Sequence, residues 1–198
     1  MPSAGDPTTN PRFPEATWRH QTWLAFLVVA VSGFSFVFAC ATPFAAFGVL
    51  AAMTLSRTDA IRITVALWLA DQVIGYAVLG YPRTVNSFSW GLAIGVAAVS
   101  STIVARRIVS RLRAAQGLTQ AVVALGGTFA VYETALFTFA AAGFGGTDSF
   151  AVPIVGRILV LNAAALAGLY ALYRIGTVVG ISRRPTVPTA APARPVSP

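Results

Sequence analysis

The residues of this chain that could do chemistry are the few polar and charged side chains inside its long apolar segments. They comprise two carboxylates, two amides and one guanidinium: Asp71, Gln72, Glu133, Arg157 and Asn162. A charged side chain at the centre of a bilayer is costly, so such residues usually face the interior of a helix bundle or a wet cavity. We therefore expect these side chains to meet at one polar centre between helices.

Counting along each apolar segment places the charged residues at comparable depths. Asp71 lies near the middle of its segment, and Glu133 lies slightly outward of the middle of a later one. Arg157 precedes the central Asn162 of the last segment by about 7.5 Å of helix. If the last two segments pack as an antiparallel pair, Glu133 and Arg157 are within reach of an ion pair, which removes most of the cost of burial. Asp71 could share the same arginine.

Aromatic and amide side chains gather at the outward ends of the same segments. Tyr76 and Tyr81 end one segment, and Asn86, Phe88 and Trp90 begin the next. An outward-opening cavity with aromatic rings at its mouth and charges at its base fits a small polar or cationic solute. An alternative is that the three charged residues form a structural network that fixes helix register. The predicted ligand-binding residues are Asp71, Gln72, Tyr76, Asn86, Trp90, Glu133, Arg157 and Asn162.

Composition makes lipid the solvent for most of the chain. Of its 198 residues, 56% are hydrophobic and only 10% are charged, too few charges to cover a soluble domain of this size. All 14 basic residues are arginines, and most of them flank the apolar segments, so membrane topology explains them better than nucleic-acid binding does. With one cysteine and one histidine, the sequence predicts no disulfide, no metal site and no cofactor. It also carries no nucleophile motif, and we expect no enzymatic activity.

The hydrophobic pattern predicts an all-α, polytopic membrane bundle of six transmembrane helices. Residues 1–18 read as a disordered cytoplasmic tail, 19–176 as the bundle and 177–198 as a disordered tail rich in Pro, Ala and Arg. A signal peptide cleaved near Ala39-Cys40-Ala41 is an alternative that would remove the first span. The six predicted spans are 24–39, 44–55, 61–81, 88–105, 120–142 and 151–173.

The second span is the unusual one, because it is too short to cross a bilayer without thinning or tilt. A tight reversal at Thr42-Pro43 separates it from the first span, and Asp59 is placed to cap the third. With six spans and both ends in the cytoplasm, 12 arginines fall inside and only Arg83 falls outside, as the positive-inside rule requires. We expect the inner membrane of a bacterium.

Two further features are candidates for contact with other helices or partners. Gly91 and Gly95 form a small-xxx-small pair that lets another helix approach closely. Four arginines follow in the fourth-to-fifth connection, where they set topology or contact a partner or anionic lipid; they are Arg106, Arg107, Arg111 and Arg113.

In size, six spans, cytoplasmic ends and an outward polar site, the chain resembles the substrate-binding S components of energy-coupling-factor vitamin transporters. The small residues Ala41, Ala45 and Gly48 are similar to the patches through which that family docks on a membrane coupling subunit driven by ATPases. The resemblance implies a transport protein that captures a vitamin, a cofactor precursor or a cation for a larger transporter. A non-transporting scaffold or assembly subunit of a larger membrane complex is the alternative.

Overall fold

A computed structural model describes residues 42–112 and 117–178 of the chain. The first predicted span, residues 1–18 and 179–198 of the predicted tails, Ala41 and Arg113 lie outside the described residues. Thr177 and Val178, predicted as the start of the C-terminal tail, belong to the last helix instead. Every regular element in the described ranges is helical: α2 (Phe44–Thr54), α3 (Arg57–Ala77), α4 (Val85–Arg111), α5 (Leu118–Phe139), a π-helical turn η1 (Ala140–Phe144), a 3-10 turn η2 (Thr147–Phe150) and α6 (Val152–Val178). The predicted all-α class is confirmed.

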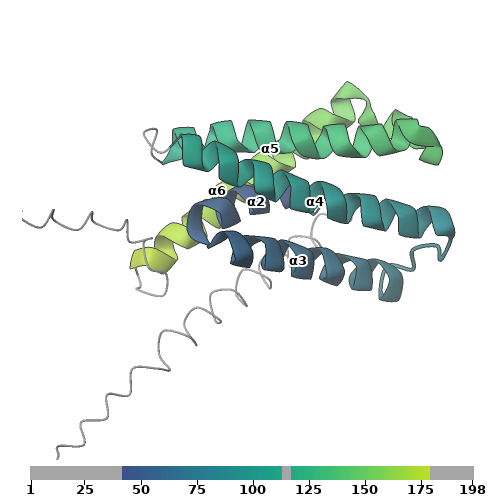
Figure 1. The fold of residues 1–198 in the computed structure, drawn as a ribbon, viewed down its shortest axis with the longest axis horizontal. Coiled ribbons are helices and arrows are strands. Elements are labelled where there is room, and N and C mark those ends of the chain that lie inside the picture. Colours follow the sequence, from purple (N-terminus) through teal and green to yellow (C-terminus); the bar gives the residue numbers. More distant parts are fainter. Residues whose placement is uncertain (1–41, 113–116, 179–198) are drawn as a thin grey trace, which may run out of the picture.

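The helices alternate in direction, which gives the bundle two distinct ends (Figure 1). At the loop end lie the α3–α4 connection and the two turns η1 and η2. At the arginine end lie the short α2–α3 connection and the C-terminal part of α4, which carries Arg106, Arg107 and Arg111.

Local chemistry explains where α3 and α4 begin. The Ser56 hydroxyl accepts a hydrogen bond from the Asp59 backbone N–H at 3.2 Å, and Thr84 accepts one from Ser87 N–H in the same way. Serine and threonine are favoured at this position because they satisfy a backbone donor that the helix leaves unpaired. The capping residue of α3 is therefore Ser56, and Asp59 supports it by accepting the Ser56 hydroxyl at 2.7 Å.

The short helix α2 is the centre of the fold. Each residue from Phe44 to Ala52 is buried, and α2 contacts α3, α4, α5 and α6. Its 11 residues extend about 16 Å, roughly half of a hydrocarbon core of ~30 Å. A helix that is apolar on all sides is expected in such a position. Four other helices enclose α2 on its sides.

Four helices of the described ranges are long and apolar enough to cross a membrane. They cover residues 57–77, 85–111, 118–144 and 152–175. Their outer faces carry large apolar side chains, for example Leu92 at 61% exposure and Val160 at 67%. Because water penalises exposed apolar surface on this scale, lipid is the natural surrounding. The fold is that of a helical membrane protein.

Candidate functional site: a carboxylate-lined cavity at the loop end

A cavity of about 530 Å³ lies among α2, α3, α4, α5, α6 and the turn η2. This volume falls within the usual range for small-molecule sites. Two of the residues that line the cavity are carboxylates and four are aromatic. Its walls are formed by Thr42, Phe44, Asp71, Trp90, Ile94, Tyr132, Glu133, Leu136, Gly146, Ser149, Phe150 and Ile158.

Asp71 reaches the cavity from the C-terminal half of α3 and contacts Thr42, which precedes α2. The Thr42 hydroxyl donates a hydrogen bond to Asp71 Oδ1 at 2.5 Å. The Gln72 amide approaches the other carboxylate oxygen, Oδ2, at 3.5 Å, which is too long to be strong. Asp71 thus keeps one oxygen firmly bonded and one with capacity for a further donor.

Glu133 reaches the same cavity from α5. Its side chain is half-buried, and no hydrogen bond or ion pair to it is formed within residues 42–112 and 117–178. A half-buried carboxylate that faces a cavity is costly unless a donor or a cation occupies that space. Among the described residues that line the cavity, none is basic.

Aromatic rings form much of the remaining wall. Phe44 and Tyr132 lie with their ring centroids 6.2 Å apart. Trp90 packs edge-on against Phe139 at 5.1 Å, and a Cβ added to Gly146 would lie 3.5 Å from the Trp90 ring. The loop segment between α5 and α6 therefore packs against Trp90. Gly143, Gly145 and Gly146 all have positive φ, which glycine adopts without strain.

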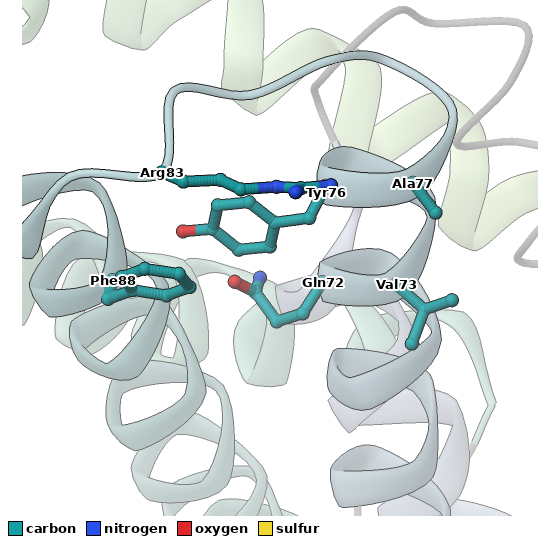
Figure 2. Close-up of a pocket in the computed structure, with 6 residues that line it drawn as sticks. All are labelled: Gln72, Val73, Tyr76, Ala77, Arg83 and Phe88. Carbon is teal, nitrogen blue, oxygen red and sulfur yellow. The ribbon is translucent and has the colours of Figure 1, made fainter.

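Gln72 and Tyr76 line a second, shallow depression on the outer side of α3 and α4. Figure 2 shows Arg83 extended over the Tyr76 ring, with Gln72 and Phe88 beside it. Tyr76 stacks on Phe88 with centroids 4.8 Å apart, and its hydroxyl lies 3.0 Å from the Ser87 hydroxyl. The structure thus divides the predicted aromatic mouth between two places: Trp90 lines the cavity, whereas Tyr76 lines the depression.

Asn86 lines neither hollow. It is exposed in the first turn of α4.

Asn162 holds the bundle together instead of lining the cavity. Its Oδ1 atom accepts a hydrogen bond from the Ala46 backbone N–H at 3.1 Å, and its amide nitrogen donates to Ile158 O at 3.0 Å. Ala46 lies in the first turn of α2, where backbone donors have no partner within the helix. Asn162 therefore caps a helix that begins inside the protein, a role that its sequence position did not reveal.

The expected ion pair between Glu133 and Arg157 is not formed. Arg157 is exposed on α6, and it makes no ion pair within the described residues. The reason is that α6 packs mainly on α2 and makes only a few contacts with α5. Equal depth on two helices does not bring side chains together unless the helices also face one another. Within the described residues, the polar centre therefore contains Asp71 and Glu133 without an arginine.

The small residues that were candidates for partner contact are used inside the bundle. A Cβ on Gly91 would lie 2.3 Å from Gln72 Oε1, and one on Gly95 would lie 2.6 Å from the Trp68 ring. The predicted close helix approach at this pair is confirmed, and the Trp68 indole N–H donates to Gly91 O at 2.7 Å. Ala45 and Gly48 are likewise buried. These four positions offer no surface to a partner.

Helix α4 carries one structural and two exposed arginines at the arginine end. Arg106 donates a hydrogen bond to Leu55 O at 2.7 Å, which satisfies a carbonyl at the C-terminal end of α2. Arg107 and Arg111 are exposed.

Several lining residues escaped sequence reasoning. Thr42 was read only as part of a turn, and Tyr132 was passed over although it precedes Glu133. Phe44, Ser149 and Phe150 also line the cavity. Most of these residues lie next to the short apolar segment 44–55 or in the Gly-rich connection, and that was the only sequence feature that could have pointed to them. They lie on other segments than Asp71, so helical periodicity does not place them on its face.

The described ranges contain no group of three or more His, Cys, Asp or Glu side chains placed to hold a metal ion. Comparison of the chain with family models, with curated proteins and with solved structures finds no match. The cavity that joins Asp71, Glu133 and Trp90 is thus the feature from which a function can be argued.

Proposed function

We propose that the protein is an integral membrane transport protein that captures a small solute in the cavity between Asp71 and Glu133. The observation that carries the proposal is the cavity itself. It places two carboxylates and four aromatic rings around a volume of about 530 Å³, inside a bundle where ionisable groups are costly. Intramembrane carboxylates that face a hollow typically mark a solute or ion pathway.

The proposed setting is the inner membrane of a bacterium, with six crossings and both termini in the cytoplasm. In this layout α2 is the short second crossing, and the first lies in the residues before Thr42. The arginine end then faces the cytoplasm, and the loop end faces outward, in agreement with the positive-inside rule. The cavity would take up solute from the outer side.

The resemblance to S components extends the proposal to a binding subunit of a larger transporter. The buried small residues cannot serve as its docking surface, so a coupling partner would contact the exposed guanidinium groups of Arg107 and Arg111. Such rim charges favour partner choice and association rate more than affinity.

Native mass spectrometry of the protein released from mild detergent tests the solute-binding proposal. We expect a small molecule to travel with the wild-type chain and to be lost from Asp71→Asn and Glu133→Gln. Asp148→Asn is the matched control, because Asp148 is an exposed carboxylate at the same end of the bundle and does not line the cavity. A bound molecule that all four proteins retain equally, or that none of them carries, would contradict the proposal.

A non-transporting scaffold subunit is the second candidate, and one observation favours it. The hydrogen bond from Thr42 to Asp71 ties α3 to the start of α2, so Asp71 has a structural use without any ligand. Under this reading, Asp71→Asn and Glu133→Gln should lower the abundance of the folded protein or of its complex. Under the transport reading, both variants stay abundant and lose uptake.

A further inference from the structure

We infer that the solute of this cavity is an amphipathic organic cation, with its positive charge held by Asp71 and Glu133 and its apolar body against the aromatic wall. The inference rests on the proposed solute-binding function and names the chemical class of that solute. It follows from the charge of the cavity, from the kind of wall that surrounds the charge and from the way each carboxylate is partnered.

The charge of the cavity is of one sign. Asp71 and Glu133 both line it, whereas no described lining residue is basic. Arg157, the nearest candidate for neutralising them along α6, is exposed and forms no ion pair within the described ranges. Two carboxylates that line one cavity favour a cation inside it, because attraction strengthens in a medium of low dielectric constant.

The two carboxylates differ in their partners, which shows where a ligand can bind. Asp71 Oδ1 is occupied by the Thr42 hydroxyl at 2.5 Å. Its Oδ2 atom has only the distant Gln72 amide, at 3.5 Å, and Glu133 has no partner in the described part of the chain. Oxygens of both carboxylates therefore remain to accept from the N–H groups of a ligand.

The wall identifies the rest of the ligand. Phe44, Trp90, Tyr132 and Phe150 contribute aromatic rings, and Ile94, Leu136 and Ile158 contribute aliphatic surface. Aromatic faces attract ammonium groups through the ring quadrupole, with tryptophan the strongest. A fully hydrated inorganic cation would gain nothing from such a wall, whereas a cation with an apolar body would bury its own surface there.

The test uses benzylammonium as the probe, with benzyl alcohol and benzoate as its neutral and anionic analogues of similar shape. Dissociation constants come from the rise in the unfolding midpoint of the detergent-purified full chain with probe concentration. We expect benzylammonium to bind at least about tenfold more tightly than benzyl alcohol, the ratio that 1.4 kcal/mol corresponds to, and benzoate to give no shift.

Variants locate the binding. Asp71→Asn keeps an oxygen for the Thr42 hydroxyl, and Glu133→Gln removes no bond within the described residues, so both should fold. We expect each to weaken benzylammonium binding at least about tenfold and to leave benzyl alcohol unchanged. Trp90→Leu should weaken binding more than Trp90→Phe, which keeps a ring. Asp148→Asn is the control and should bind as wild type.

Three results would overturn the inference. Benzyl alcohol or benzoate binding as tightly as benzylammonium would show that the cavity does not select a cation. The proposed function would still stand in that case if a co-purified solute is lost from Asp71→Asn. Benzylammonium binding that is equal in wild type, Asp71→Asn and Glu133→Gln would place the cation elsewhere. The absence of a co-purified solute with no benzylammonium shift would remove both proposals.

Discussion

The two ends of α2 meet opposite surroundings, although the helix is only 11 residues long. At its C-terminal end, the Arg106 guanidinium satisfies the Leu55 carbonyl. In the middle of the helix, Gly48 lies against Thr102 with almost no space between them. At its N-terminal end, α2 opens into a cavity where Glu133 has no partner within the described ranges. A polar group that is hydrogen-bonded to a neighbouring helix holds the two helices in place. A polar group that faces a cavity is available to a ligand.

The largest expected effect comes from a substitution in the tightly packed contact between α3 and α4. Gly95→Leu would drive a side chain into the Trp68 ring, because even a Cβ there lies at 2.6 Å. Overpacking of a rigid core costs about 1–3 kcal/mol and sometimes more, so we expect a much lower unfolding midpoint in detergent.

The matched control is Gly126→Leu in α5, where an added Cβ meets nothing within 4 Å and the position is exposed. That variant should be as stable as wild type or slightly more so. Equal loss in the two leucine variants would mean that α3 and α4 are not in close contact.

A smaller effect is expected at the C-terminal end of α2. Arg106→Gln removes a charged donor from Leu55 O, and because Arg106 is only partly buried, we expect a loss of about 1 kcal/mol, typical of an ordinary hydrogen bond. Arg107→Gln removes the same formal charge from an exposed neighbour and should change the unfolding midpoint little. If thermal unfolding ranks the two variants equally, Arg106 contributes through charge alone and does not cap α2.

The smallest effect compares two buried threonines. The Thr102 hydroxyl bonds Ala98 O at 2.9 Å and lies 3.1 Å from the Thr64 hydroxyl, whereas the buried Thr128 hydroxyl has no partner in the described chain. Thr102→Val should cost about 0.6–1 kcal/mol, a typical value for such bonds between membrane helices. Thr128→Val should be neutral or stabilising, and a loss at Thr128 as large as that at Thr102 would argue against this comparison of satisfied and unsatisfied groups.

Sequence reasoning was most successful where a property belongs to a single helix. The all-helical class followed from the apolar segments, and depth counting selected Asp71 and Glu133, which the structure brings to one cavity. The close approach at Gly91 and Gly95 followed from side-chain size alone. Each of these properties depends on the position of a residue along its helix, and that position can be counted from the sequence.

Properties that depend on how helices are rotated and arranged could not be predicted in this way. Arg157 has the depth of Glu133 but lies on another side of the bundle, because α6 packs on α2. Asn162 looked like a central polar ligand, yet it caps α2 across 116 positions of sequence. The absence of charge in 44–54 was a signal that α2 is enclosed by other helices, but it did not indicate which helices enclose it.

A double-mutant cycle for benzylammonium binding tests most directly whether Asp71 and Glu133 form one site. Wild type, Asp71→Asn, Glu133→Gln and the double variant are titrated side by side. If one cation contacts both carboxylates, each single variant loses most of the affinity, and the double variant loses clearly less than the sum of the two losses in binding free energy. Losses that add fully, or a single variant that binds as wild type, would contradict a shared site.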